Sequence, residues 1–273
     1  MNIAMLRIQV ISDVHLEFRS TVDYKDILMP SAPILILAGD VCPCCEHTFK
    51  LLHAFIQWCS KHFEHVFYVP GNHEFYSESN HKNNTMDLII QRIRAGLKEF
   101  KNVYFLYNNL VKFANFCVAG TTLWSDLALN SHREIQQRMS DYSAIHVADS
   151  MSKSGVRRLR TADTVQFHKS AVGFIKRCKT IANKNKLPLI VITHHKPTCS
   201  AEQCEGISSA YESDLSSLMG YTDTSYLVLW VHGHTHRHND QRINGTRIYS
   251  NAYGYPKEPG TNHIKNATIR LNV

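Results

Sequence analysis

The chain has 273 residues, of which 44% are hydrophobic and 19% are charged, a composition typical of folded globular proteins. This length can bury a sizeable core, and the composition excludes intrinsic disorder and collagen-like repeats. The formal net charge of +7 favours anionic partners but does not select among phosphorylated metabolites, nucleic acids and acidic surfaces.

The amino-terminal segment is apolar over residues 3–11 but is interrupted by Arg7 and Gln9, so it predicts a strand and not a signal peptide. No apolar run is long enough for a membrane span. We therefore expect a cytoplasmic protein whose eight cysteines are reduced thiols. The cluster Cys42-Pro43-Cys44-Cys45 would bind zinc only with a second ligand pair, such as Cys199 and Cys204, which nothing in the sequence brings near it.

The first hundred residues alternate short apolar runs with longer amphipathic ones, as strands and helices do in α/β proteins. Apolar residues recur at helical spacing over residues 49–63 and 86–100. The predicted strands lie at residues 6–11, 34–38 and 66–69. This part therefore predicts three units of strand, loop and helix.

A second sheet is expected to begin near residue 103, where strand patterns follow one another closely. Asn108-Asn109 predicts a turn between the first two of these strands, and Asn244-Gly245 predicts a later hairpin. The predicted strands of this half lie at residues 103–107, 110–113, 116–120, 187–193 and 226–231.

One segment of this second half, at about residues 125–162, is polar and rich in arginine and has no clear strand pattern. It predicts an inserted, partly helical segment. Asp163 is a candidate cap for a helix that reaches about residue 183. We expect residues 1–273 to form a single domain that contains this insertion.

Metal-binding side chains follow the most apolar strands. In α/β sheets, ligands bind beyond the carboxyl ends of the strands, so these endings are expected to converge. Imidazoles, carboxylates and one amide oxygen together suit Mn²⁺, Fe²⁺, Co²⁺, Ni²⁺ or Zn²⁺, whereas Ca²⁺ prefers more oxygen ligands. The five endings are Asp13-Val14-His15, Gly39-Asp40, Gly71-Asn72-His73-Glu74, His194-His195 and Gly233-His234-Thr235-His236.

In order and spacing, these five blocks resemble the signature of the calcineurin-like metallophosphoesterase superfamily, and the resemblance covers most of the chain. It implies an α/β fold, a four-layer αββα sandwich of two mixed β-sheets flanked by helices, with a dinuclear metal centre at the strand ends. It also implies two divalent ions, with Mn or Fe favoured over Zn, Co or Ni. One ion would be held by Asp13, His15, Asp40 and His236, and the other by Asp40, Asn72, His194 and His234.

The resemblance implies hydrolysis of phosphate esters, in which a hydroxide bridging the two ions attacks phosphorus in line. The catalytic candidates are Asp40, which bridges the ions, and His73, which would contact the phosphate or protonate the leaving oxygen. The candidates for substrate binding are Asn72, His73 and His195. His195 could equally be a hydrogen-bond donor beside the ligand His194.

The chain departs from the protein Ser/Thr phosphatases of this superfamily in its second block. Those enzymes continue the block with an Asp and a phosphate-gripping Arg, where this chain has Val41-Cys42-Pro43-Cys44-Cys45. The final Gly-His-Thr-His block resembles the branch of small phosphodiesterases and nucleotide-cleaving enzymes. We therefore expect a phosphorylated small molecule or a nucleotide as substrate, with phosphodiesters favoured.

Two other functions stay open. The basic balance suggests a nuclease acting on DNA or RNA, although aromatic and basic residues are not interleaved as in a nucleic-acid stacking platform. A non-enzymatic metal-binding scaffold is the other alternative, and the presence of His73 with every expected ligand speaks against it. No protein partner can be inferred.

Overall fold

The computed structural model describes residues 5–19, 21–78, 81–128, 131–199, 206–222 and 225–272. Its first β-sheet has the spatial order β14-β1-β2-β3-β4, in which β1 to β4 are parallel and β14 is antiparallel to β1. These strands are β1 (Met5–Ile11), β2 (Ile34–Leu37), β3 (His65–Tyr68), β4 (Val103–Phe105) and β14 (Thr268–Asn272).

The second β-sheet has the spatial order β12-β13-β11-β9-β6-β5, and β10 pairs with β11. Its central strands β13, β11, β9 and β6 are parallel, whereas β5 and β12 add antiparallel edges. These strands are β5 (Asn109–Lys112), β6 (Cys117–Thr121), β9 (Leu189–Thr193), β10 (Tyr221–Thr222), β11 (Ser225–Val231), β12 (Asn239–Ile243) and β13 (Thr246–Ser250).

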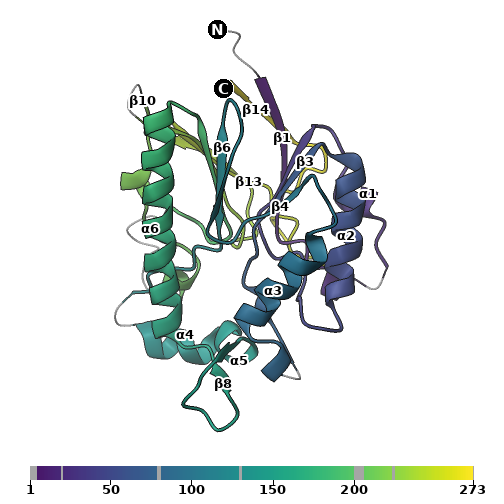
Figure 1. Cartoon of the computed structure of the whole chain (residues 1–273), viewed down its shortest axis with the longest axis vertical. Helices are drawn as coiled ribbons and strands as arrows, with labels where there is room; N and C mark the ends of the chain where they lie inside the picture. The colour runs from purple at the N-terminus through teal and green to yellow at the C-terminus, as the bar shows by residue number, and fades with distance from the viewer. Residues whose placement is uncertain are drawn as a thin grey trace.

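Helices cover the outer faces of both sheets (Figure 1). The first sheet carries α2 and α3, and the second carries the long helix α6. The helices are α1 (Tyr24–Ile27), α2 (Phe49–His62), α3 (Met86–Leu97), α4 (His132–Arg138), α5 (Asp141–Ala144) and α6 (Thr161–Asn185). The layers are therefore helix, sheet, sheet and helix, which confirms the predicted four-layer sandwich.

Successive side chains of a strand point to opposite faces of its sheet, and this alternation explains why the two sheets pack together. In β2, Leu35 and Leu37 pack among the residues of α2 and α3, whereas Ile34 and Ile36 belong to the core between the sheets. Because both faces of these strands are buried, they read as continuous apolar runs. The sheets form a rigid support whose parallel strands end at one common edge.

Two details of the second half differ from the sequence prediction. Strand β4 pairs in parallel with β3 and completes the first sheet, so the second sheet begins only at β5. Asn108, at φ 55°, thus lies where the chain crosses between the sheets and not in a hairpin. Helix α6 begins before Asp163, whose carboxylate accepts a hydrogen bond from the backbone N–H of Arg160 at 2.8 Å.

The segment around residues 125–162 holds α4 and α5, as the helical prediction implies, and also a two-stranded hairpin. The hairpin strands are β7 (His146–Ala148) and β8 (Val156–Arg158). Each strand has only three residues and is partly exposed, so its sequence shows no clear alternation of apolar and polar residues.

Among the described residues, every cysteine but one is a free thiol. Six of those in the described ranges are free and buried. Cys199 is disulfide-bonded, contrary to the expectation of reduced thiols throughout, and Cys204 lies outside the described residues. Within the described ranges, no group of metal-binding side chains contains a cysteine, so nothing supports a zinc site at Cys42. Across the same ranges, no helix is both long and apolar enough to cross a membrane.

Candidate metal centre

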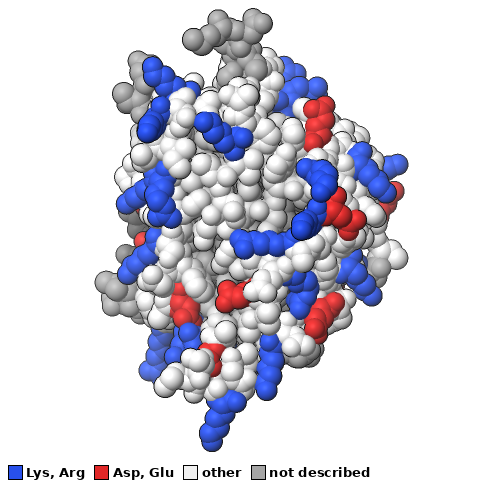
Figure 2. Space-filling model, viewed as in Figure 1, with Lys and Arg blue, Asp and Glu red and all other residues white. Residues whose placement is uncertain are grey.

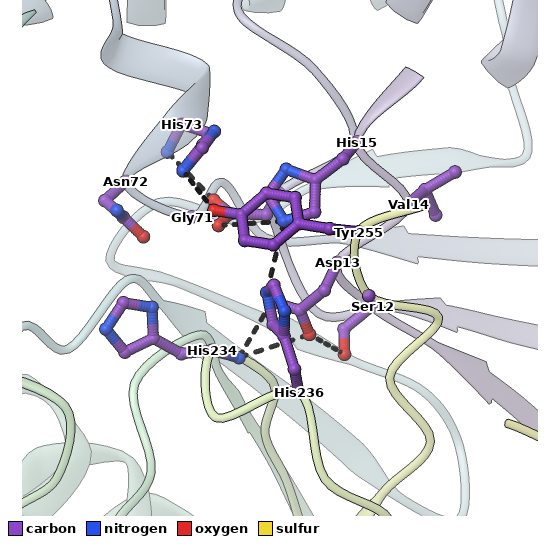
Figure 3. Close-up of polar contacts among 12 residues, drawn as sticks. Ser12, Asp13, Val14, His15, Gly71, Asn72, His73, His234, His236 and Tyr255 are labelled. Atoms are coloured by element: carbon purple, nitrogen blue, oxygen red, sulfur yellow. Dashed lines mark hydrogen bonds and ion pairs between the residues drawn. The ribbon is translucent and has the colours of Figure 1, made fainter. Parts of the chain in front are cut away.

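The candidate ligands meet where the parallel strands of the two sheets end (Figure 3). Figure 3 shows Asp13, His15 and His236 close together with His73 beside them, whereas the ring of His234 extends away from these three on the side of Asn72. The seven candidate ligands come from the loops after five strands: β1, β2, β3, β9 and β11. The convergence predicted from the strand endings is therefore present in the fold.

The backbone at this edge adopts a conformation that residues other than glycine rarely take. Positive φ angles are costly for such residues and persist where the surroundings impose them, often at functional sites. Five of the seven candidate ligands have one: Asp13 (55°), His15 (48°), Asp40 (54°), His234 (68°) and His236 (49°). The fold thus holds the ligands in place against their local backbone preference.

Two glycines allow the strand ends to approach each other. A Cβ atom on Gly71 would collide with Oδ1 of Asp40 and lie 2.7 Å from the Asp40 backbone nitrogen. A Cβ atom on Gly233 would lie 2.8 Å from Oδ2 of Asp13. A glycine directly before a candidate ligand therefore allows two strand ends to approach closely, as the sequence predicts.

A first cation position is framed by two imidazoles. The Nε2 atoms of His15 and His236 face each other at 3.2 Å. Nε2 of His236 is 3.4 Å from Oδ1 of Asp13, and Nε2 of His15 is 3.9 Å from Oδ2 of Asp40. Nitrogen lone pairs that converge beside carboxylates suit a divalent cation.

A second cation position has the same design. Nε2 of His194 is 3.1 Å from Nδ1 of His234 and 3.0 Å from Oδ1 of Asn72. It also lies 3.3 Å from Oδ2 of Asp40, the same oxygen that borders the first position. The residues present therefore fit two cations that share the Asp40 carboxylate.

The buried charges of the site favour positive charge at these positions. Burial opposes ionisation of Asp40, but the neighbouring histidines, above all His194, hold the pKa of Asp40 well below its usual range. Burial likewise opposes protonation of His194, but the charge of Asp40 raises the pKa of His194 to about 10. His236, buried beside Asp13, has its pKa raised to about 9. The carboxylates thus attract protons or cations to the ring nitrogens that face them.

Three further contacts orient the ligands from outside. Nδ1 of His236 is 2.6 Å from Oε2 of Glu258, and Nδ1 of His194 is 2.8 Å from the carbonyl oxygen of Ala38. Nδ2 of Asn72 donates to Oδ1 of Asp141 at 2.8 Å, which turns the amide oxygen of Asn72 toward the second cation position. Such partners fix ligand orientation and raise metal affinity.

Replacing Asp141 by alanine is expected to weaken binding at the second cation position about 10- to 100-fold, because the Asn72 amide can then turn over. Asp141 is the first residue of α5, so the inserted segment supplies this contact. Metal titration by calorimetry measures the effect. Tyr76→Phe is the comparison variant. It removes a hydroxyl that donates to the same Asp141 oxygen at 2.8 Å and accepts only a longer bond from Nδ2 of Asn72, at 3.3 Å, so it should cost less. Equal losses in the two variants would contradict the orienting role.

Glu74 fastens the ends of β2 and β3 together. Its Oε2 accepts the backbone N–H groups of Asp40 at 3.0 Å and Gly71 at 2.7 Å. Its Oε1 accepts the N–H of Val41 at 2.7 Å and the hydroxyl of Tyr68 at 2.9 Å. This fully buried carboxylate therefore supports the loop that carries Asp40.

Glu74→Ala is expected to lower the free energy of unfolding by about 3 kcal/mol, because it leaves buried N–H groups without acceptors. Urea denaturation of the metal-free protein measures this change. Glu64→Ala, at an exposed position after α2, serves as control and should change stability by less than about 0.5 kcal/mol. A Glu74→Ala protein as stable as this control would rule out the fastening role.

His73 lies beside the first cation position at the start of the short 3-10 helix η2 (His73–Phe75). Its backbone N–H donates to Oδ1 of Asp40 at 2.8 Å, and its Nε2 is 3.3 Å from the Tyr255 hydroxyl. Burial opposes protonation of the ring, but the charge of Asp40 raises the pKa of His73 above its usual value. His73, His15 and Asp40 also form a group whose ligand atoms lie within 4.8 Å of one another.

His195 packs against two candidate ligands, His194 and His234, but has none of the nitrogen contacts that frame the cation positions. Its ring packs 4.1 Å from that of His234, and its Nδ1 is 3.3 Å from the carbonyl oxygen of Thr122. Burial lowers the pKa of His195 to about 3, so the ring is neutral. Its part in substrate binding stays a prediction.

A cavity of about 1240 Å³ opens over the metal centre and is lined by Asp40, Asn72, His73, His234 and His236. Other parts of its wall come from the inserted segment and the region of β12, including Arg138, Met139, Asn239 and Gln241. The volume is sufficient for a ligand much larger than phosphate.

Comparison with known proteins agrees with this geometry. A family model for calcineurin-like phosphoesterases matches residues 6–238, a range that includes all seven candidate ligands. The chain is 27% identical over 272 residues to "Uncharacterized protein L509" of Acanthamoeba polyphaga mimivirus. This alignment covers 92% of each protein. The crystal structure of phosphopantetheinyl hydrolase from Mycobacterium tuberculosis has a similar fold, with a TM-score of 0.64, 16% identity and coverage of 98% of this chain and 96% of that one. The His and Asp clusters are compatible with a metal-dependent phosphoester hydrolase, and the chain belongs to the calcineurin-like phosphoesterase family.

Proposed function

We propose that this protein hydrolyses phosphodiesters or nucleotides with two divalent cations that share Asp40. The observation that carries the proposal is the pair of cation positions, each framed by two facing imidazole nitrogens at the wall of one cavity. Cations bound there would lower the pKa of a water molecule held between them and stabilise the charge that develops on the phosphate. Mn or Fe is the proposed native metal, and the mixed imidazole and carboxylate donors are compatible with these ions.

His73 completes the proposed chemistry. Its ring borders the cavity, and its Nε2 would contact the phosphate and pass a proton to the leaving oxygen. The bond from its backbone N–H to Asp40 keeps this ring beside the shared carboxylate. Asn72 offers its amide oxygen to the second cation position, so its additional contact with substrate is part of the proposal.

The preference for diesters is supported by the space around the site. The cavity wall includes residues of the inserted segment, such as Met139, and residues near β12, such as Gln241. A phosphate with substituents on two oxygens can use both regions, whereas a small monoester fills little of the volume. Where protein phosphatases carry a phosphate-gripping Arg, this chain has cysteines that are buried in the core, including Cys42 and Cys44.

A nuclease activity is less well supported. Figure 2 shows Lys and Arg side chains spread over one face with acidic side chains among them, and not gathered into one continuous basic patch. A phosphorylated small molecule or nucleotide is therefore the proposed partner. A cytoplasmic location stays a prediction, which the six free thiols support and the disulfide of Cys199 does not.

The deciding experiment is a hydrolysis assay of the metal-reconstituted protein. It compares an aryl phosphodiester with the corresponding monoester, cyclic nucleotides, dinucleoside polyphosphates and DNA. We expect metal-dependent turnover that is fastest on a diester or nucleotide and is abolished by a chelator. A preference for the monoester would overturn the diester assignment, salt-sensitive DNA cleavage would indicate a nuclease, and inactivity on all of them would favour a scaffold.

A further inference from the structure

Glu17 makes a contact that the metal positions do not explain. It lies two residues after His15, in the 3-10 helix η1 (Leu16–Phe18), at the wall of the cavity. Its Oε1 is 3.2 Å from Nδ1 of His15 and 3.1 Å from Nδ1 of His73. Because these imidazoles follow different strands, β1 and β3, one carboxylate oxygen joins two parts of the site.

This contact determines which nitrogen of each ring faces away from Glu17. An ionised carboxylate only accepts hydrogen bonds, so Nδ1 of both rings must carry the hydrogen. Nε2 of His15 then faces His236 at the first cation position. Nε2 of His73 is left on the side of the Tyr255 hydroxyl, 3.3 Å away.

The other contacts of the His73 ring are less selective, because the Tyr255 hydroxyl near Nε2 can donate or accept and so suits either ring nitrogen. The ring stacks on Tyr76 with centroids 4.2 Å apart, which restrains its plane but not the edge that faces the cavity. The hydrogen bond to Glu17 supplies that selection. Oε2 of Glu17 is buried and has no hydrogen-bond partner among the described residues, a costly arrangement for a residue that serves stability alone.

We propose that Glu17 is a positioning residue that holds His73 by its Nδ1–H and so keeps Nε2 directed at the substrate. This inference rests on the proposed function for its catalytic consequence, in which the proton on Nε2 passes to the leaving oxygen as the P–O bond breaks and is replaced from water. Glu17 exchanges no proton in this role. Because the same oxygen holds His15, the orientation of the proton donor is tied to that of a metal ligand.

The first test detects the hydrogen bond between His73 and Glu17 directly, so it does not depend on hydrolysis of any substrate. In zinc-loaded protein with ¹⁵N-labelled histidine, the Nδ1 proton of His73 is identified as the signal lost in His73→Ala. We expect it to exchange slowly in the unaltered protein and to disappear in Glu17→Ala. Absence of the signal from the unaltered protein, or its persistence in Glu17→Ala, would overturn the proposal even if no phosphate ester is hydrolysed.

The second test compares leaving groups at saturating metal. Glu17→Ala should lower kcat about 10- to 100-fold on an alkyl diester, which needs a proton to release its alcohol. It should lower kcat much less on a 4-nitrophenyl diester, and KM should change little on both. In a His73→Ala background, Glu17→Ala should cause no further loss. Equal losses on both esters, or additive losses in the double variant, would contradict the positioning role.

Glu258→Gln is the matched control for an effect through the metal. Glu258 holds Nδ1 of His236 as Glu17 holds Nδ1 of His15. It reaches His73 only indirectly, by accepting the backbone N–H of Tyr255 at 2.9 Å, and glutamine keeps an acceptor oxygen for that bond. Glu258→Gln should weaken cation binding without changing the ratio of rates on the two esters. A changed ratio in this control would place the effect at the metal and overturn the role of Glu17. If Glu17→Ala does not fold, Glu17→Gln keeps the shape and should show a smaller change of the same kind.

Discussion

His73→Ala is expected to lower kcat by about 10²- to 10⁴-fold while the protein keeps two bound cations. The ring borders the cavity and lies beside the first cation position, where it can reach the leaving oxygen but is not one of the facing imidazole pairs. Turnover and metal content should be measured on the same preparation, by a diester assay and by elemental analysis after desalting.

The metal content decides how this result is interpreted. His73 also belongs to a group with His15 and Asp40 whose ligand atoms lie within 4.8 Å, so a loss of one cation would reassign His73 as a ligand. His62→Ala, at an exposed position on α2, should leave both turnover and metal content unchanged. Full activity of His73→Ala would remove His73 from the mechanism.

Asp40→Asn should have the other large effect, the loss of at least one cation and a fall in turnover of about 10³-fold or more. Oδ2 of Asp40 borders both cation positions, at 3.9 Å from Nε2 of His15 and 3.3 Å from Nε2 of His194. Asparagine keeps the size of the side chain but removes the negative charge that both positions use.

Elemental analysis and the diester assay again measure the outcome. Asp87→Asn, at an exposed position on α3, is the control for the loss of one surface carboxylate and should behave like the unaltered protein. An Asp40→Asn protein that binds two cations and turns over normally would show that the two positions do not share this residue.

The convergence of the candidate ligands could be predicted from sequence because each one follows a short apolar strand in a recognisable block. His15 lies beside Asp13 in the chain, and His234 beside His236, so local spacing already groups them. The layered fold follows from the same pattern, since strands buried on both faces need helices outside and a second sheet inside.

The residues that orient the ligands could not be predicted in this way. Asp141 reaches Asn72, and Glu258 reaches His236, only through the tertiary fold, so no spacing marks these pairs. Glu17 stands close to His15 in the sequence, but its contact with His73 depends on how β1 and β3 are placed. The sequence pattern also places β4 in the wrong sheet, because its apolar pattern suits an edge of either sheet.

The positions of Asp13 and His236 in the chain have a consequence for biosynthesis. The first ligands emerge early from the ribosome, whereas His234 and His236 follow β11, and β1 gains its second neighbour only when β14 is made. A nascent chain therefore cannot assemble either cation position until most of it has been translated. Any cation that these positions bind can therefore enter its complete site only after the segment that follows β11 has joined the end of β1.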